Sequence, residues 1–183
     1  MTVSFSRPLT LTLTLGLAAL TGCGMQATMV RNADLPEAVR VPAGQTQSGY
    51  TKAVGELTYE CRNKKDSTDA FEWAFVGPVA TLSSVSGDVV GKYYAGPTWE
   101  SKDGSKVTGK QLAVSPGAPG AIPLQLVKAN PSMGEGSMKD VTYIQRLNTV
   151  GGVAPALPCG AEQKGQRQQV AYKADYAFYK AGM

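Results

Sequence analysis

Residues 89–112 read VVGKYYAGPTWESKDGSKVTGKQL, and this stretch carries the pattern that decides the fold. Three short runs rich in β-branched and aromatic residues, Val89 to Ala95, Pro97 to Lys102 and Ser105 to Leu112, follow one another with only turn residues between them. Asp103-Gly104 tolerates the positive φ of a tight turn, so it predicts a type I′ hairpin. The stretch therefore predicts consecutive antiparallel strands.

The same alternation of short strands and turn residues extends from Leu35 to the end of the chain. The other predicted strands are Leu57 to Cys61, Phe71 to Val76, Ala80 to Val85, Leu124 to Ala129, Val141 to Asn148 and Ala171 to Lys180. In the last of these strands, Tyr172, Ala174, Tyr176 and Phe178 share one face. No long amphipathic helix or internal repeat accompanies the strands. Eight or nine short strands predict an all-β fold, an antiparallel sandwich or barrel, forming a single domain over residues 35–183.

The first 22 residues have the pattern of a secretory signal. They contain one charge, Arg7, no acid, and a run of Leu, Thr and Ala that is too short for a bilayer span of about 20 apolar residues. The run ends in Leu20-Thr21-Gly22-Cys23, which resembles the lipobox of bacterial lipoproteins. We therefore expect cleavage before Cys23 and attachment of a diacylglyceryl lipid to its thiol. An ordinary secretory signal with an incidental cysteine is the alternative.

Lipid on Cys23 predicts a protein held at a membrane on the exported side of the cell envelope. Two or three acyl chains anchor a protein firmly, because each buried methylene contributes about 0.8 kcal/mol. Residues 23–34 are short, polar and unpatterned, and predict a tether between lipid and domain. Gly24 resembles the class that bacteria with two membranes place in the outer membrane. The lipid bilayer is thus the first expected partner.

Histidine is absent from all 183 residues, and this absence excludes several classes of function. Ser-His-Asp and Cys-His catalytic arrangements and His-based zinc sites cannot form without it. No glycine-rich phosphate-binding motif occurs. The net charge of +4 is spread along the chain, so no nucleic-acid partner is predicted. We expect no metal and no cofactor, and the charge allows an envelope polymer or protein as a further partner.

Cys61 and Cys159 remain once Cys23 carries lipid. An exported protein meets an oxidising compartment, in which paired thiols form disulfides. A bridge that closes about 100 residues stabilises a fold by about 4.7 kcal/mol in the chain-entropy model. We expect a Cys61–Cys159 disulfide, with two separately buried thiols as the alternative.

Two tryptophans, each beside a glutamate, form the candidate ligand face. The residues of this face are Trp73, Tyr94, Trp99, Glu72 and Glu100. The tryptophans could stack on sugar rings, although aromatic side chains of this kind more often fill a core. Glu72 and Glu100 could act as the acid and base of a glycoside hydrolase if they lay about 5–5.5 Å or 6.5–9.5 Å apart. The simpler expectation places both acids in water, in separate surroundings, with the tryptophans inside.

Arg146 lies in a predicted strand that is otherwise rich in apolar residues. A guanidinium in such a strand is expected to pair with a buried acid, and a ligand clamp is the alternative.

Several segments together resemble the family known as domain of unknown function 3455, which occurs in exported bacterial and fungal proteins. They are Val54-Gly55, Tyr59 to Cys61, Phe71 to Phe75, Tyr94 to Glu100, Asp103 to Ser105, Tyr143 to Arg146, Asn148 to Gly152 and Cys159. Tyr93 occupies a position at which the family often has histidine. The resemblance supports Cys61 and Cys159 as a pair and implies no activity.

These patterns predict a lipid-anchored binding or structural module of the envelope, with its ligand unspecified. The alternative is a carboxylate-dependent hydrolase of envelope glycans, which would need Glu72 and Glu100 to converge in a cleft. A binding module needs only an accessible site with apolar and polar groups.

Overall fold

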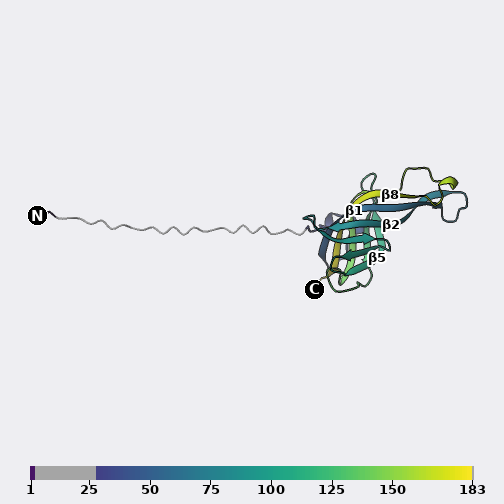
Figure 1. Cartoon of the computed structure of the whole chain (residues 1–183). Helices are drawn as coiled ribbons and strands as arrows, with labels where there is room; N and C mark the ends of the chain where they lie inside the picture. Colours follow the sequence, from purple (N-terminus) through teal and green to yellow (C-terminus); the bar gives the residue numbers. More distant parts are fainter. Residues whose placement is uncertain (3–27, 183) are drawn as a thin grey trace.

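The computed structural model describes residues 1–2 and 28–182, and eight antiparallel strands dominate it (Figure 1). Each strand pairs with the next along the chain, and the first also pairs with the last, so the sheet closes into a barrel. The strands are β1 (Gln45–Asn63), β2 (Phe71–Ser83), β3 (Val89–Tyr94), β4 (Thr98–Ser101), β5 (Lys106–Ser115), β6 (Leu124–Ala129), β7 (Val141–Gly151) and β8 (Arg167–Ala181). The all-β prediction is confirmed, and of its two architectures the barrel is the one formed.

The barrel interior is filled by side chains from alternate positions of each strand. On β8 the predicted common face of Tyr172, Ala174, Tyr176 and Phe178 points into this core. Trp99 of β4 lies at the centre of an aromatic cluster. Its ring stacks on Tyr93 with centroids 4.7 Å apart and meets Tyr176 edge-on at 5.5 Å. Offset and edge-on contacts of this kind stabilise a core beyond the area they bury.

Strand β2 continues through Gly77-Pro78, where the sequence analysis places a break between two strands. The pairing with β1 shifts here, because Thr58 faces Gly77 while Tyr59 faces Phe75. Val76 is therefore the extra residue of a β-bulge, two residues before Pro78. The bulge keeps Trp73 and Phe75 on the same face of β2 as Pro78, Ala80 and Leu82. The two short runs predicted from the sequence are thus one bent strand.

The ends of β1, β2 and β8 extend beyond the barrel as an arm, visible on the right of Figure 1. We define the arm as residues 59–75 and 152–170, which include the β1–β2 loop, the β7–β8 loop and the 3-10 helix η3 (Ala161–Gln163). The β3–β4 turn and the β5–β6 loop lie at this same end of the barrel, because each strand reverses the direction of the one before. The C-terminus lies at the other end (Figure 1).

Residues 28–41, which we call the strap, cover the outer face of the barrel. The strap contains the 3-10 helices η1 (Asn32–Asp34) and η2 (Glu37–Val39). Val39 and Val41 pack on outward-facing residues of β6 and β8, among them Leu126 and Tyr179. The buried Gln145 side chain donates to the Val39 carbonyl at 2.6 Å and accepts from the Tyr179 hydroxyl at 2.7 Å.

Residues 28–34 also contact the barrel, because Val30 N donates to the Gln47 side chain at 2.8 Å and this side chain donates to the Thr28 carbonyl at 2.7 Å. The expected signal and Cys23 lie outside the described residues. Within the part of the chain that the structure describes, no helix has the length and apolar character needed to cross a bilayer.

Candidate functional site

A cavity of about 300 Å³ enters the barrel at the end that carries the arm. Barrels of eight strands leave room inside for side chains or for one small ligand, and the mouths of barrels are common ligand sites. The cavity walls combine apolar residues of β1, β2 and β6 with phenols and one guanidinium. The polar lining residues include Tyr59, Tyr93, Gln125, Arg146, Tyr172 and Tyr176.

Two of the lining tyrosines have hydroxyl groups with no protein partner. Tyr176 has none of its surface exposed and Tyr172 has 2% exposed. Neither hydroxyl has a hydrogen bond of acceptable distance and angle to any described residue. The Tyr93, Tyr172 and Tyr176 hydroxyls nevertheless lie close enough together for hydrogen bonding among them to shift the pKa of each phenol. A buried hydroxyl left unpaired costs about 1–3 kcal/mol. By contrast, the Tyr59 hydroxyl donates to the Gly152 carbonyl at 2.6 Å.

Arg146 brings a positive charge to the same cavity. It lies two residues after the core residue Ile144 on β7, so its side chain points inward. Its Nε and Nη2 atoms donate to the Pro123 carbonyl at 3.1 and 2.9 Å. Among the described residues no carboxylate forms an ion pair with it, so the expected pairing of Arg146 with a buried acid is wrong. Arg146 is also the only charged residue among those described that line the cavity.

Burial and the Arg146 guanidinium shift the pKa of the four cavity phenols in opposite directions. Burial raises the pKa of Tyr59, Tyr93, Tyr172 and Tyr176 above the ordinary value, while the positive charge of Arg146 opposes the rise at all four. The guanidinium is therefore close to every phenol of the cavity. All four remain neutral hydrogen-bond donors over the physiological pH range.

The cavity wall also includes an amide pair. The Gln125 side chain donates to the Gln111 side chain at 2.6 Å, across the β5–β6 ladder. Leu57, Ile122 and Val127 supply apolar surface nearby. The arrangement can hold one small molecule with an apolar body and a polar end, as ligand cavities with few polar groups do.

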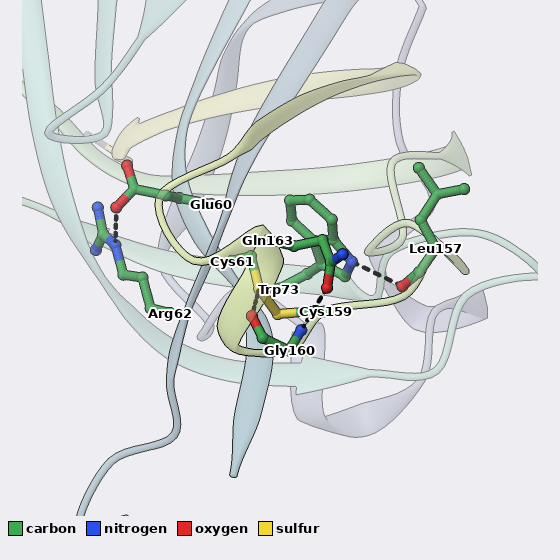
Figure 2. Close-up of a disulfide and its surroundings, with 8 residues drawn as sticks. All are labelled: Glu60, Cys61, Arg62, Trp73, Leu157, Cys159, Gly160 and Gln163. Atoms are coloured by element: carbon green, nitrogen blue, oxygen red, sulfur yellow. Dashed lines mark hydrogen bonds and ion pairs between the residues drawn. A yellow bond between two sulfur atoms is a disulfide. The ribbon is translucent and has the colours of Figure 1, made fainter. Parts of the chain in front are cut away.

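The disulfide predicted between Cys61 and Cys159 is confirmed, with Cα atoms 5.6 Å apart (Figure 2). It joins β1 to the β7–β8 loop on the inner side of the arm. Trp73 lies opposite Cys61 in the β1–β2 register, and its indole N–H donates to the Leu157 carbonyl at 3.0 Å (Figure 2). On the other face of the arm, the Glu60 carboxylate accepts from Arg62 and Arg167 at 2.6 and 2.7 Å, which lowers the pKa of Glu60 to about 2.

The β7–β8 loop reaches the cavity through Gly152. This residue has a φ of 78°, and a Cβ atom there would lie 2.9 Å from Tyr172 Cβ and 3.0 Å from Leu57 Cδ1. Only glycine fits both the backbone and the space. The disulfide and Trp73 thus hold a loop whose first residues form part of the cavity surroundings.

The five residues of the predicted ligand face do not form one surface. Trp99 is fully buried in the core, as the simpler expectation had it, whereas Trp73 is only partly buried, against the disulfide loop. Tyr94 and Glu100 do come together on the outside of the barrel, where the Tyr94 hydroxyl donates to Glu100 at 2.7 Å. The reason for the separation is strand alternation, which points Trp99 inward and its neighbour Glu100 outward.

Glu72 and Glu100 have separate surroundings, as expected for acids that do not form a catalytic pair. Glu72 is exposed and lies opposite Arg62 in the β1–β2 register. The expected exposure is wrong for Glu100, whose side chain is 19% exposed between Lys92 and Lys106, at 3.2 and 3.4 Å. The Tyr94 hydrogen bond and the two lysines lower the pKa of Glu100, whereas a catalytic acid needs a raised pKa.

Among residues 1–2 and 28–182, no group of three or more acidic or cysteine side chains is arranged to hold a metal ion. The sequence patterns did not predict that Tyr59, Tyr93, Tyr172 and Tyr176 line a common site. Their signal was the two-residue spacing of aromatic residues along inward faces, which also describes an ordinary core. Arg146 was singled out, and the structure brings it to these tyrosines.

The structure defines a class of protein: a closed eight-stranded antiparallel barrel with a disulfide-bonded arm and a small aromatic cavity at the arm's base. The chain belongs to the family described as "Protein of unknown function (DUF3455)", whose model matches residues 42–180. The matched region covers the eight strands, except the last residue of β8, and both disulfide cysteines, and it leaves out the whole strap. No curated protein and no solved structure matches this sequence.

Proposed function

We propose that this protein is a lipid-anchored binding module of the cell envelope, with its ligand site in the barrel cavity. The observation that carries the proposal is the pair of buried, unpaired hydroxyls of Tyr172 and Tyr176 on the cavity wall. Each such group lowers the stability of the free protein by about 1–3 kcal/mol, because it loses its hydrogen bond to water on folding and gains none in return. Both oxygens are covered by neighbouring atoms in the free protein, so a bound molecule would recover this free energy by shifting the rings and accepting their hydrogen bonds.

The envelope location rests on two features of the chain. Leu20-Thr21-Gly22-Cys23 follows a signal-like run, and the Cys61–Cys159 disulfide suits an oxidising compartment outside the cytoplasm. Fractionation of cells that express Cys23→Ser tests the anchor. The proposal expects the wild-type chain in the membrane fraction and the variant released by washing in high salt. Retention of the variant through such a wash would place the anchor elsewhere.

The binding function is tested on full-length protein purified from its own envelope under mild conditions. Native mass spectrometry should show an additional bound mass that solvent denaturation removes. Gln125→Trp places an indole in the cavity and should abolish the bound mass, whereas Gln169→Trp, on the exposed face of β8, should keep it. A bound mass that survives Gln125→Trp would show that the cavity is not the site. No observation favours the hydrolase alternative, because Glu72 and Glu100 have different neighbours.

A further inference from the structure

We infer that the ligand of the cavity is a small organic monoanion, a carboxylate on an apolar or aromatic body. This inference rests on the proposed function, since it names the chemical class that the same cavity would hold. It follows from the charge, the donors and the walls of the site taken in turn.

The charge of the site is a single uncompensated guanidinium. Arg146 has no carboxylate partner within the described chain, and it is the only charged residue described in the cavity wall. Its two recorded hydrogen bonds go to one acceptor, the Pro123 carbonyl, and both come from Nε and Nη2. The Nη1 hydrogens are left for another acceptor. One cation complements one negative charge, and guanidinium favours the planar carboxylate over other anions of that charge.

The remaining buried polar groups of the cavity that lack a hydrogen bond among the described residues are two phenol hydroxyls, which can act as donors. The Tyr172 and Tyr176 hydroxyls are buried and unpaired, and each stays protonated because burial disfavours a phenolate. Two neutral O–H groups and a guanidinium can all donate hydrogen bonds, so a ligand group that only accepts hydrogen bonds complements them. An ionised carboxylate has about four lone-pair sites and no donor of its own, so it can satisfy several of them at once.

The walls of the cavity determine what kind of molecular body the carboxylate can be attached to. Leu57, Phe75 and Val127 present apolar surface, and the phenol rings of Tyr59 and Tyr93 present aromatic faces. A volume of about 300 Å³ is at the lower end of ligand cavities, so the body must be small. A fatty chain or a flat ring system of one or two rings fits these walls, whereas a sugar with many hydroxyls would leave most of its donors unpaired.

The test compares two molecules of equal shape that differ in charge, naphthoate and naphthamide. Isothermal titration calorimetry of the full chain should show naphthoate binding about ten- to a hundredfold more tightly, because a charge-assisted hydrogen bond contributes about 1.5–3 kcal/mol. Arg146→Gln should remove this preference, because it should weaken naphthoate much more than naphthamide. Arg40→Gln is the matched control, since exposed Arg40 also donates through Nε to a backbone carbonyl, that of Leu35.

Each outcome decides between the two proposals. Equal affinity of the wild-type chain for both molecules, abolished by Gln125→Trp, overturns the monoanion and leaves the cavity as a binding site. Binding of both that is unaffected by Gln125→Trp overturns the cavity itself. A failure of naphthoate to bind up to its solubility limit overturns the monoanion. If Arg146→Gln does not fold, Arg146→Lys replaces it, and loss of the planar guanidinium should then weaken naphthoate more than naphthamide.

Discussion

Tyr59 and Tyr176 both turn their rings into the barrel, but only Tyr59 has a protein partner for its hydroxyl. The Tyr59 O–H donates to the Gly152 carbonyl, whereas the Tyr176 O–H lies near the Tyr93 and Tyr172 hydroxyls without a hydrogen bond of acceptable distance and angle among the described residues. An enclosed donor without an acceptor opposes folding. A residue that lowers the stability of the free protein in this way is typical of a binding site, where function and stability compete.

Substitution of each tyrosine by phenylalanine tests this reading. Tyr176→Phe should leave the free energy of unfolding unchanged or raise it by about 1 kcal/mol, because it removes an unpaired polar group. Tyr59→Phe should lower it by about 1–2 kcal/mol, because it leaves the Gly152 carbonyl without its donor. Urea denaturation of both variants gives the comparison. A loss of stability in Tyr176→Phe as large as that in Tyr59→Phe would mean that Tyr176 has a partner in the free protein.

Two glycines of β1 make a second matched pair. A Cβ atom on Gly55 would collide with the Val79 carbonyl and Ala80 Cα of the neighbouring strand, whereas on Gly49 its nearest contact is Phe178 Cδ2 at 3.4 Å. Gly55→Ala should therefore cost about 1–3 kcal/mol or more, as overpacking does, and Gly49→Ala should cost little. Thermal denaturation of both variants measures the difference. Equal melting temperatures would show that β1 and β2 can move apart at Gly55.

The arm is the element that depends most on covalent cross-linking. Beyond the barrel it consists of strand ends and two loops, joined by the disulfide, by the hydrogen bond of Trp73 and by the Glu60 ion pairs. Exposed ion pairs contribute little to stability. The disulfide is therefore the covalent contact that holds the β7–β8 loop, beside the Trp73 hydrogen bond and the backbone hydrogen bonds of Cys61 with Gly165 and Gln166.

Replacing both cysteines, Cys61→Ser with Cys159→Ser, should lower the free energy of unfolding by about 2–5 kcal/mol. It should also expose residues 152–166 to limited proteolysis before the barrel strands are cut. Addition of reductant to the wild-type chain should reproduce both effects and should not alter the double variant. An unchanged proteolysis pattern would indicate that Trp73 and loop packing suffice.

At the scale of the whole molecule, the tyrosines make stability depend on alkaline pH. Burial raises the pKa of Tyr179 to about 12 and that of Tyr176 well above its ordinary value, whereas an unfolded tyrosine has a pKa of about 10. The folded state thus binds more protons above pH 10, so this contribution to stability is complete below pH 10 and is lost as the pH rises through the folded values.

We therefore expect cooperative unfolding above about pH 10. Tyrosinate absorbance and far-ultraviolet circular dichroism, recorded in the same titration, should change together for the buried phenols. Complete ionisation of the tyrosines with the β-sheet signal intact would contradict the enclosed core.

Much of the fold could be predicted from the chain, because strand alternation and turn residues are local signals. Leu124 to Ala129 appears as predicted, and Gly87 and Gly104 take the positive φ expected of turns. Asp103 does not, so the type I′ turn is wrong; its carboxylate instead accepts from the Ser105 and Ser137 backbone N–H groups at 2.9 and 2.8 Å. Barrel closure, the Val76 bulge and the strap depend on pairings between distant residues that no local pattern reveals.

The site was less predictable than the fold for the same reason. Arg146 was a visible anomaly in its strand, but whether an acid lay opposite could be decided only by the tertiary arrangement. The aromatic residues of β8 were placed on the correct face without any sign of which would border a cavity. The two tryptophans were candidates because of their large aromatic side chains, but Trp99 packs in the core and Trp73 packs against the β7–β8 loop.

The central claim is that the cavity beside Tyr172, Tyr176 and Arg146 is a ligand site. It is tested most directly by a crystal structure of the full-length protein purified from its own envelope. The account predicts electron density for a small organic molecule in the cavity, with an acceptor group within hydrogen-bond distance of the Tyr172 and Tyr176 hydroxyls and of Arg146. A cavity that holds only water, or that side chains fill so that both hydroxyls find protein partners, would contradict it.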